Sequence, residues 1–307
     1  MQIEHAVIVT RRTRLETLTE RFNSRRQAQF YVEHSGGDFA DYEKEYDEYH
    51  RSLERVRTAL SGTIRYTAID RSFVPAYLFS EKDAVIVVGQ DGLVANTAKY
   101  ALGIPIIAVN PDPERFDGVL LPFNVSDFLP ALERVRAGGF QAKRVTMAQA
   151  LLGDRQRLLA FNDLFIGPRS HISARYSISF KGATEEQSSS GIIVATGAGS
   201  TGWLSSLFNM ANGIARAFAG RKDLKGSVLA WDAEDLVFVV REPFVSQVSF
   251  AGIVAGTIGR GAELVIESHM PSEGVIFSDG VETDFLRFNS GAVARIGVAP
   301  EQALLVV

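Results

Sequence analysis

The first half of the chain alternates short apolar runs with segments of helical spacing. The pattern predicts buried strands over residues 6–9, 64–69, 84–88 and 104–109, and helices over residues 45–60 and 93–102. In the first helix Tyr46, Tyr49, Leu53, Val56 and Leu60 recur at steps of three and four, which places them on one face. Strands of near-continuous Val and Ile separated by helices are typical of a parallel sheet covered on both faces. We therefore expect an N-terminal α/β domain.

The rhythm changes after a predicted helix over residues 126–136, for which we expect Ser126 as the cap and Gly138 and Gly139 as the end. Short, closely spaced runs then predict strands over residues 157–166, 174–180, 191–196, 236–240, 245–250, 264–268, 275–278 and 292–298, with one helix over residues 203–219. Such spacing indicates a mostly antiparallel β domain. We expect an α/β domain over residues 1–138 and a β-rich domain over residues 139–307, whose last strands could return to the first domain.

Composition narrows the classes of protein. The chain has 307 residues, 46% of them apolar and 22% charged, which suits one large or two packed globular domains and excludes a mainly disordered chain. A net charge of −4 argues against binding of nucleic acid or acidic membranes through the overall charge. No cysteine is present, so disulfides and thiolate chemistry are excluded. The chain lacks an apolar run of membrane-spanning length or a signal-like start, so we expect a cytoplasmic protein.

The first stretch with candidate chemistry is Gly89-Gln90-Asp91-Gly92, between a buried strand and a helix. Ligands in open α/β sheets bind at the carboxyl ends of the strands, where a glycine turn lets phosphates approach the N–H groups of the helix start. Asp91 beside bound phosphates requires Mg²⁺ or a hydroxyl group that gives it a proton, as in phosphoryl transfer. The alternative is a glycine turn with no further role.

The second stretch is Asn162-Asp163, inside an apolar segment. Because strand residues alternate between faces, one of the two points inward, where an unpartnered polar group would cost about 1–3 kcal/mol. An amide and a carboxylate together suit the base edge and ribose diol of a nucleoside. The alternative is a strand end or bulge whose side chains bond the local backbone.

The third stretch runs from residue 191 to residue 203, GIIVATGAGSTGW. Gly197, Gly199 and Gly202 fit G-x-G-x-x-G, but their place in the β-rich half argues against a Rossmann site. The turn could still hold a ligand through Ser200 and Thr201, with Trp203 as an aromatic surface, or it could simply cap a helix. Asp279-Gly280 is interpreted as a hairpin turn, and the five histidines lack metal-site spacing, so we assign no structural metal.

Taken in order, these segments resemble the NAD kinase family, in particular its mitochondrial-type branch, over most of the chain. GQDG is similar to the family's GGDGT, and residues 108–122 resemble the stretch after the next strand in that branch. NDLFIG (162–167) is similar to its NE or ND motif, residues 188–203 to its TGS-containing segment, and SDG (278–280) to its C-terminal signature. The resemblance implies an α/β domain and a β-rich domain around a cleft, where ATP and Mg²⁺ phosphorylate the adenosine 2′-hydroxyl of NAD.

The resemblance also assigns roles to residues. Asp91 would be the catalytic base, Asn162 and Asp163 would hold the adenosine, Thr201 would contact the adenine, and Trp203 would replace the family's tyrosine. The complete set implied for nucleotide binding is Gly89, Gln90, Gly92, Asn162, Asp163, Thr196, Gly199, Ser200, Thr201, Trp203 and Asp279. The implied partners are nucleotides and a second copy of the chain in a homodimer.

Besides Trp203, four positions depart from the family pattern. Gln90 stands at its second glycine, where a positive φ would make a side chain costly by about 1–2 kcal/mol, and Leu93 replaces its threonine. Gly197 and Ala198 replace a proline and a hydroxyl-bearing residue. Besides an NAD kinase-like enzyme, the departures leave open a non-catalytic NAD(P)-binding regulator or a kinase of another small hydroxyl compound, such as a sugar or nucleoside. A Rossmann oxidoreductase is the weakest alternative.

Overall fold

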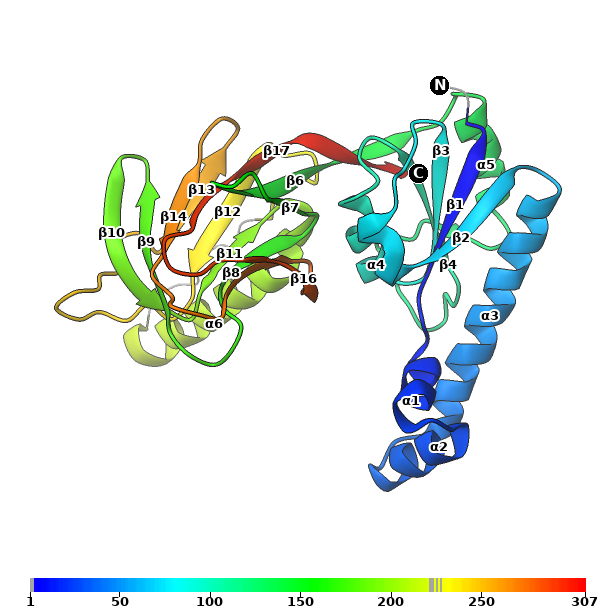
Figure 1. Cartoon of the computed structure of the whole chain (residues 1–307), viewed down its shortest axis with the longest axis horizontal. Coiled ribbons are helices and arrows are strands. Elements are labelled where there is room, and N and C mark those ends of the chain that lie inside the picture. Colours follow the sequence, from blue (N-terminus) through cyan, green and yellow to red (C-terminus); the bar gives the residue numbers. More distant parts are fainter. Residues whose placement is uncertain (1–2, 221–223, 225, 227) are drawn as a thin grey trace. The chain divides into compact units, whose positions relative to one another are not determined.

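The chain forms two compact units in a computed structural model that describes residues 3–220, 224, 226 and 228–307 (Figure 1). Unit 1 comprises residues 1–143 and the last four residues, 304–307. Unit 2 comprises residues 144–303. The expected domain boundary after residue 138 falls in the turn that follows the last helix of unit 1.

Unit 1 is built on a parallel sheet. Its strands are β1 (His5–Thr10), β2 (Arg65–Asp70), β3 (Asp83–Val88) and β4 (Pro105–Asn110), in the spatial order β4-β3-β1-β2. The end of β17 (Val293–Val306) pairs parallel with β4, and so does the short β5 (Phe123–Asn124). Every residue of β3 and β4 is buried, as expected for strands covered on both faces. The predicted parallel α/β architecture is confirmed.

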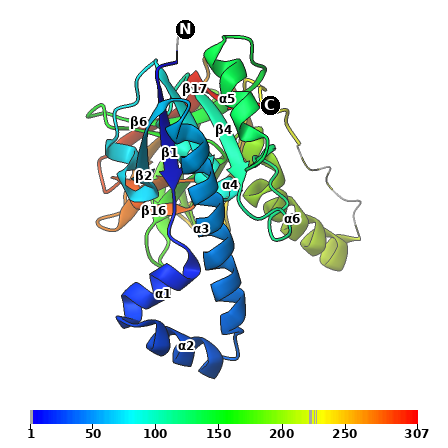
Figure 2. The ribbon, with the colours of Figure 1, turned by 90° about the vertical axis from the view of Figure 1, so that its right-hand side faces the viewer.

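The helices of unit 1 include two that the apolar pattern did not predict. These are α1 (Arg14–Phe22) and α2 (Arg25–His34), which lie beside the first turns of the long helix α3 (Phe39–Ser61) (Figure 2). The remaining helices are η1 (Arg71–Ala76), α4 (Asp91–Ala98) and α5 (Phe128–Arg136). The expected face of α3 is buried from Tyr49 to Leu60. Asp127, and not Ser126, is the N-cap of α5, and it makes no side-chain capping bond, so the predicted cap is wrong.

Unit 2 is a sandwich of antiparallel sheets. One contains β10-β9-β14-β17 with the pair β6–β7 off this path, and the other has the order β13-β12-β11-β8-β15-β16. The strands not yet bounded are β6 (Ala142–Leu152), β7 (Arg157–Ala160), β8 (Asp163–Pro168), β9 (Ala174–Phe180), β10 (Ala183–Ser189), β11 (Ile192–Ala195), β12 (Asp235–Val240), β13 (Ala255–Gly259), β14 (Leu264–Ser268), β15 (Gly274–Ser278) and β16 (Val281–Arg287). The main core lies between the sheets, where Ile166 and Val194 meet Ile178 and Ile266. The predicted antiparallel β domain is confirmed.

One helix, α6 (Trp203–Ala219), packs on the outer face of the six-stranded sheet. Its bounds are those predicted, and it follows the short turn η2 (Ala198–Thr201). Leu207 packs with Phe165 and Ile193, which point away from the main core because neighbouring strand residues face opposite sides. In the described part of the chain, no helix is long and apolar enough to cross a membrane.

Two predicted strands differ from the structure. Residues 157–166 form two strands that are separated at Phe161 and Asn162, rather than one. Residues 245–250 form a loop, because Ser246 N donates to Ser249 O (3.0 Å) and closes a turn there. Its apolar side chains are therefore exposed, with Val248 at 76%.

Candidate functional site

The first half of the candidate site links β3 to α4 in unit 1. Gln90 is the N-cap of α4, with φ −110° and ψ 166°, which any residue adopts. A strain at Gln90 from a positive φ is therefore absent. Its side chain makes no capping bond. In the described residues the N–H groups of Asp91 and Gly92 have no acceptor and remain available to an anion, whereas Leu93 N donates to Gln90 O (2.9 Å).

Gly89 and Leu93 pack against each other at this turn. A Cβ atom at Gly89 would lie 2.7 Å from Leu93 Cδ2, whereas a Cβ atom at Gly92 would meet nothing within 4 Å. Leu93 is 6% exposed and so fills the space under the turn instead of offering a hydroxyl to a ligand. A side chain at position 89 would require the Leu93 side chain to move, whereas one at position 92 would enter open space.

Asp91 is the first residue of α4 and is half-buried. Its Oδ1 accepts a hydrogen bond from Leu120 N (2.7 Å), in the segment after β4 that resembles the family. Its other carboxylate oxygen has no described partner. The carboxylate is thus held in place by one oxygen and can accept a proton with the other.

The second half of the candidate site lies in unit 2, where the chain breaks between β7 and β8. Asn162 is in the break, and Asp163 is the first residue of β8. Neither the Asn162 amide nor the Asp163 carboxyl group has a hydrogen-bond partner in the described part of the chain. The alternative in which these side chains bond the local backbone is therefore not what the structure shows, and both polar groups can bind a ligand.

Asp279 fixes the backbone at this break. Its carboxylate accepts hydrogen bonds from the backbone N–H groups of Phe161 (3.0 Å), Asn162 (2.6 Å) and Asp163 (3.2 Å). Asp279 and Gly280 have φ 54° and 70° and connect β15 to β16, which confirms the predicted hairpin turn. The same Asp279 thus makes the hairpin and fixes the backbone of Asn162 and Asp163.

Two carboxyl groups meet at this break, and this changes the chemistry of Asp163. Burial, with the nearby charge of Asp279 as a second cause, raises the pKa of Asp163 to about 7. Asp163 is therefore protonated over much of the acidic range and can donate as well as accept a hydrogen bond. A perturbed carboxyl group without a partner is typical of functional sites.

The glycine-rich segment of the site lies directly against Asn162. Thr196 is fully buried; its N–H group donates to Asn162 O (2.9 Å), and its hydroxyl group donates to Phe161 O (2.5 Å). A Cβ atom at Gly199 would lie 2.0 Å from Asn162 O, and one at Gly197 would lie 1.9 Å from Ala230 O. These close approaches require glycine, and they explain why no proline can occupy position 197 here.

The remaining residues of the segment differ in their access to a ligand. Ser200 is 2% exposed, and its hydroxyl donates to Gly197 O (2.7 Å) and accepts from Leu229 N (3.2 Å). Ser200 and Thr196 therefore stabilise the turn itself. Thr201 is exposed and has no described hydrogen bond, so its hydroxyl is available to a ligand.

Trp203 stands beside a pocket of about 210 Å³ that is confined to unit 2. Its ring is stacked on Phe165 (centroids 5.9 Å apart, planes at 8°), and Arg241 Cζ lies 5.5 Å from its centroid. The pocket is lined by Phe165, Pro168, Arg169, Trp203, Arg241, Val275, Phe277 and Glu282. The sequence reasoning missed Phe165, Phe277 and the arginines. Phe165 could have been found, because it lies two residues after Asp163 and so on the same face of β8.

The structure thus brings together Asn162, Asp163, Thr196, Gly199 and Asp279 in unit 2, while Gly89, Gln90, Asp91 and Gly92 lie in unit 1. Within the described ranges no three His, Cys, Asp or Glu side chains are grouped as a metal site would need.

The comparisons with known proteins concern both sequence and fold. No family model matches the chain. The NAD kinase of Heliobacterium modesticaldum is 32% identical over 132 residues, which cover 39% of this chain and 44% of that protein. The NAD kinase of Saccharolobus islandicus is 26% identical over 151 residues, covering 49% and 54%. The chain thus spans about half the length of the curated relatives that it matches.

Two solved structures have the same fold over essentially the whole chain. A yeast NADH kinase in complex with NADH has a TM-score of 0.61 and 13% identity, covering 100% of this chain and 84% of that one. An NAD kinase from Archaeoglobus fulgidus in complex with ATP has a TM-score of 0.56 and 15% identity, covering 99% and 94%. The resemblance to the NAD kinase family is confirmed, and so is the fold with an α/β part and a β-rich part that it implies. The assignment to the mitochondrial-type branch stays a prediction.

Proposed function

We propose that this protein is an NAD kinase-like phosphotransferase that uses ATP to convert NAD to NADP at the adenosine 2′-hydroxyl. The observation that carries the proposal is Asp91, whose carboxylate is held by Leu120 N at the start of a helix that follows a buried parallel strand. One carboxylate oxygen stays free to accept the proton of an attacking hydroxyl group. This is the task of the base in phosphoryl transfer.

In this proposal the residues of unit 2 bind the dinucleotide. Asn162 and Asp163 have free polar groups on a backbone fixed by Asp279, and Thr201 has a free hydroxyl. The three are suited to a ribose diol and an adenine edge. The backbone N–H groups at the start of α4 would stabilise the charge of the transferred phosphoryl group.

ATP is expected to enter with Mg²⁺. Mg²⁺ in kinase sites keeps several waters and is bound by substrate phosphates with one or two carboxylates, and it neutralises charge on the phosphates. The described residues fit an ion that is held mainly by the substrate phosphates and water, because no three His, Cys, Asp or Glu side chains among them form a separate metal site. The free oxygen of Asp91 is then left to accept the proton of the hydroxyl group.

The test is NADP formation by the purified protein with NAD, Mg²⁺ and either ATP or polyphosphate. We expect NADP from the wild type, and a loss of about 10²-fold or more in kcat for Asp91→Asn with dinucleotide binding retained. No NADP with either donor would contradict the proposal. Tight NAD or NADP binding without turnover would instead identify a regulatory homologue, and ATP consumption only with a sugar or nucleoside would identify another acceptor.

The assembly that we propose is a homodimer. The outer side of α6 exposes Met210 (46%), Ile214 (54%) and Phe218 (88%) at steps of four residues. A continuous apolar stripe of this kind is typical of a contact surface. The cytoplasmic location stays a prediction from the sequence.

A further inference from the structure

Two side chains of α3 reach the carboxyl ends of three strands in unit 1. The Tyr49 hydroxyl accepts from Arg11 N (2.9 Å), directly after β1, and donates to Val88 O (3.3 Å), the last residue of β3. Ser52 Oγ donates to Pro111 O (2.9 Å), directly after β4. Helix α3 therefore fixes the edge of the sheet from which the loop 89–92 begins.

Tyr49 contacts the sheet at the point where the order of the strands reverses. The chain proceeds from β1 to β2 on one side and then returns to β3 on the other side, so the strand order reverses between β1 and β3. Ligands in open α/β sheets bind outside the carboxyl ends of the strands at such a switch point. Here the Tyr49 hydroxyl group joins the ends of β1 and β3 through Arg11 N and Val88 O, and Val88 directly precedes Gly89.

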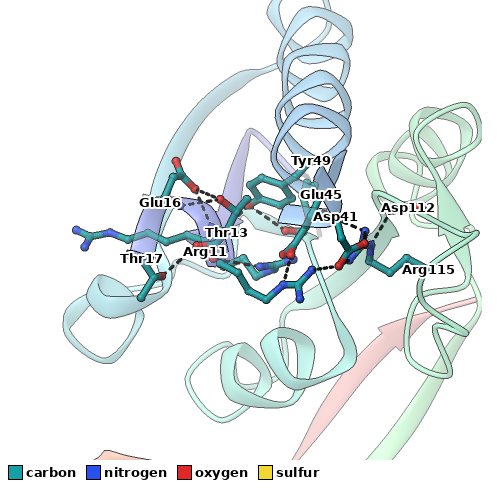
Figure 3. A network of polar contacts seen from close by, with 12 residues as sticks. Arg11, Thr13, Glu16, Thr17, Asp41, Glu45, Tyr49, Asp112 and Arg115 are labelled. Atoms are coloured by element: carbon teal, nitrogen blue, oxygen red, sulfur yellow. Dashed lines mark hydrogen bonds and ion pairs between the residues drawn. The ribbon is translucent and has the colours of Figure 1, made fainter. Parts of the chain in front are cut away.

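An ion-pair network surrounds this bridge (Figure 3). Glu45, with 4% of its side chain exposed, pairs with Arg11 (2.9 Å) and with Arg14. Asp41 pairs with Arg14 (2.8 Å) and Arg115 (2.5 Å). Asp112 also pairs with Arg115 (3.4 Å), so three carboxylates balance three guanidinium groups. The balance leaves no excess charge for an anion, and the network serves to hold α3 against its neighbours.

The bridge and the network hold two segments that flank Asp91. Tyr49 fixes Val88, which precedes the loop, and Arg115 lies in the segment that ends at Leu120, the residue whose N–H holds the Asp91 carboxylate. Arg11 Nε is buried without a hydrogen-bond partner in the described structure. A buried ion-pair network with an unpaired donor is weak evidence for a gain in folding stability. We therefore infer that the network serves to position the backbone next to Asp91.

We propose that Tyr49 is a positioning residue for the phosphoryl transfer, and that it sets the place of Asp91 by joining the ends of β1 and β3. The inference rests on the proposed function. Tyr49 is 2% exposed, and burial raises its pKa to about 12, so the hydroxyl keeps its proton and both hydrogen bonds at any working pH. A misplacement of reacting groups by about 1 Å can cost about 10²-fold in rate.

The experiment compares Tyr49→Phe with Tyr46→Phe, one turn earlier on the same helix. Tyr46 is half-buried, packs near Leu15, and its hydroxyl has no described hydrogen bond, so it is a matched control for the loss of a phenol oxygen. For Tyr49→Phe we expect kcat to fall about tenfold or more, with the KM for NAD within about twofold of wild type. Tyr46→Phe should keep both constants. Assays well below the melting temperature prevent unfolding from lowering the rate.

A second measurement separates this inference from the proposed function. Amide hydrogen exchange over residues 89–95 should be faster in Tyr49→Phe than in wild type and in Tyr46→Phe, whether or not the protein makes NADP. Unchanged exchange in that segment, or a fall in activity that only follows the melting temperature, would overturn the positioning role. Faster exchange without any wild-type turnover would overturn the proposed function alone.

Discussion

Asp163 is a carboxyl group whose protonation couples the site to the stability of unit 2. Its pKa is raised from the ordinary value of 3.8 to about 7, by burial and then by the charge of Asp279. Between these values the folded state binds a proton that the unfolded chain has released. The free energy of unfolding therefore falls as the pH rises through this window.

The prediction compares wild type with Asp163→Asn in chemical denaturation between pH 5 and pH 8. The wild type should lose on the order of 1–3 kcal/mol of unfolding free energy over this range, and Asp163→Asn should lose much less. Asp154→Asn is the control, because Asp154 is exposed and hydrogen bonds from Gln156 lower its pKa, away from this window. Equal slopes in wild type and Asp163→Asn would contradict the assignment.

The residues at this break were found from the sequence, but their surroundings were not. Asn162 and Asp163 are polar residues in an apolar run, which is a local signal. The three backbone N–H groups that donate hydrogen bonds to Asp279 belong to residues more than a hundred positions away in the sequence. No local sequence pattern indicates these hydrogen bonds. The same holds for Tyr49. The apolar face of its helix predicted that it is a core residue, but the hydrogen bond from its hydroxyl group to Val88 O depends on the packed fold.

At the scale of elements, two glycines of the candidate site have opposite structural roles. A Cβ atom at Gly92, in the first turn of α4, meets nothing within 4 Å, whereas a Cβ atom at Gly199, in η2, would lie 2.0 Å from Asn162 O. Glycine is therefore required by packing in η2 and is dispensable for folding in α4.

The two alanine variants form a matched pair. Gly92→Ala should leave the free energy of unfolding unchanged or raise it by up to about 1 kcal/mol, because alanine is the better helix former. It should still lower the rate of NADP formation about tenfold, since the methyl group would occupy the space in which the phosphates approach the helix start. Gly199→Ala should cost about 2 kcal/mol or more in stability. Denaturant titrations and initial rates measure both, and an unchanged rate in Gly92→Ala would exclude phosphate contact there.

The elements predicted best are those with a strong apolar pattern. Strands β3, β4 and β9 and helix α6 were predicted within one residue of their bounds, because β3 and β4 are continuous apolar runs, β9 has apolar residues at every second position, and α6 has them at helical spacing. Helices α1 and α2 were missed because most of their residues are polar or charged, although Thr13 and Glu16 form a capping box that could have signalled the start of α1. Strand β10 was missed because its sequence, ATEEQSS, is mostly polar.

At the scale of the molecule, two domains were predicted because the spacing of apolar runs changes near residue 138, from strands separated by helices to short, closely spaced strands. That change is visible because parallel strands read as continuous apolar runs, whereas antiparallel strands are short and separated by turns. The return of residues 304–307 to unit 1 follows from the pairing of Leu304 with Pro105, which only the folded sheet defines. The exposed apolar residues of α6, Met210, Ile214 and Phe218, could likewise be recognised only after the structure showed which side of the helix is buried.

The apolar stripe of α6 is the basis of the prediction about assembly. Leu204 and Leu207 of α6 are buried, while Ile214 and Phe218 face outward at 54% and 88% exposure. Exposed contiguous apolar surface is unfavourable in water, and a second copy that covers the stripe would remove it.

The variant Ile214→Glu, Phe218→Glu should therefore turn a dimer into a monomer, because association would bury two new charges on each copy. Light scattering coupled to gel filtration measures the mass, which should be twice that of the chain for wild type and that of one chain for the variant. Phe73→Glu is the matched control, because Phe73 is also exposed (65%) but lies on η1 in unit 1 and is not part of the proposed contact surface on α6. It should stay dimeric. A monomeric wild type, or a dimer that both glutamates leave intact, would show that α6 is not the contact surface.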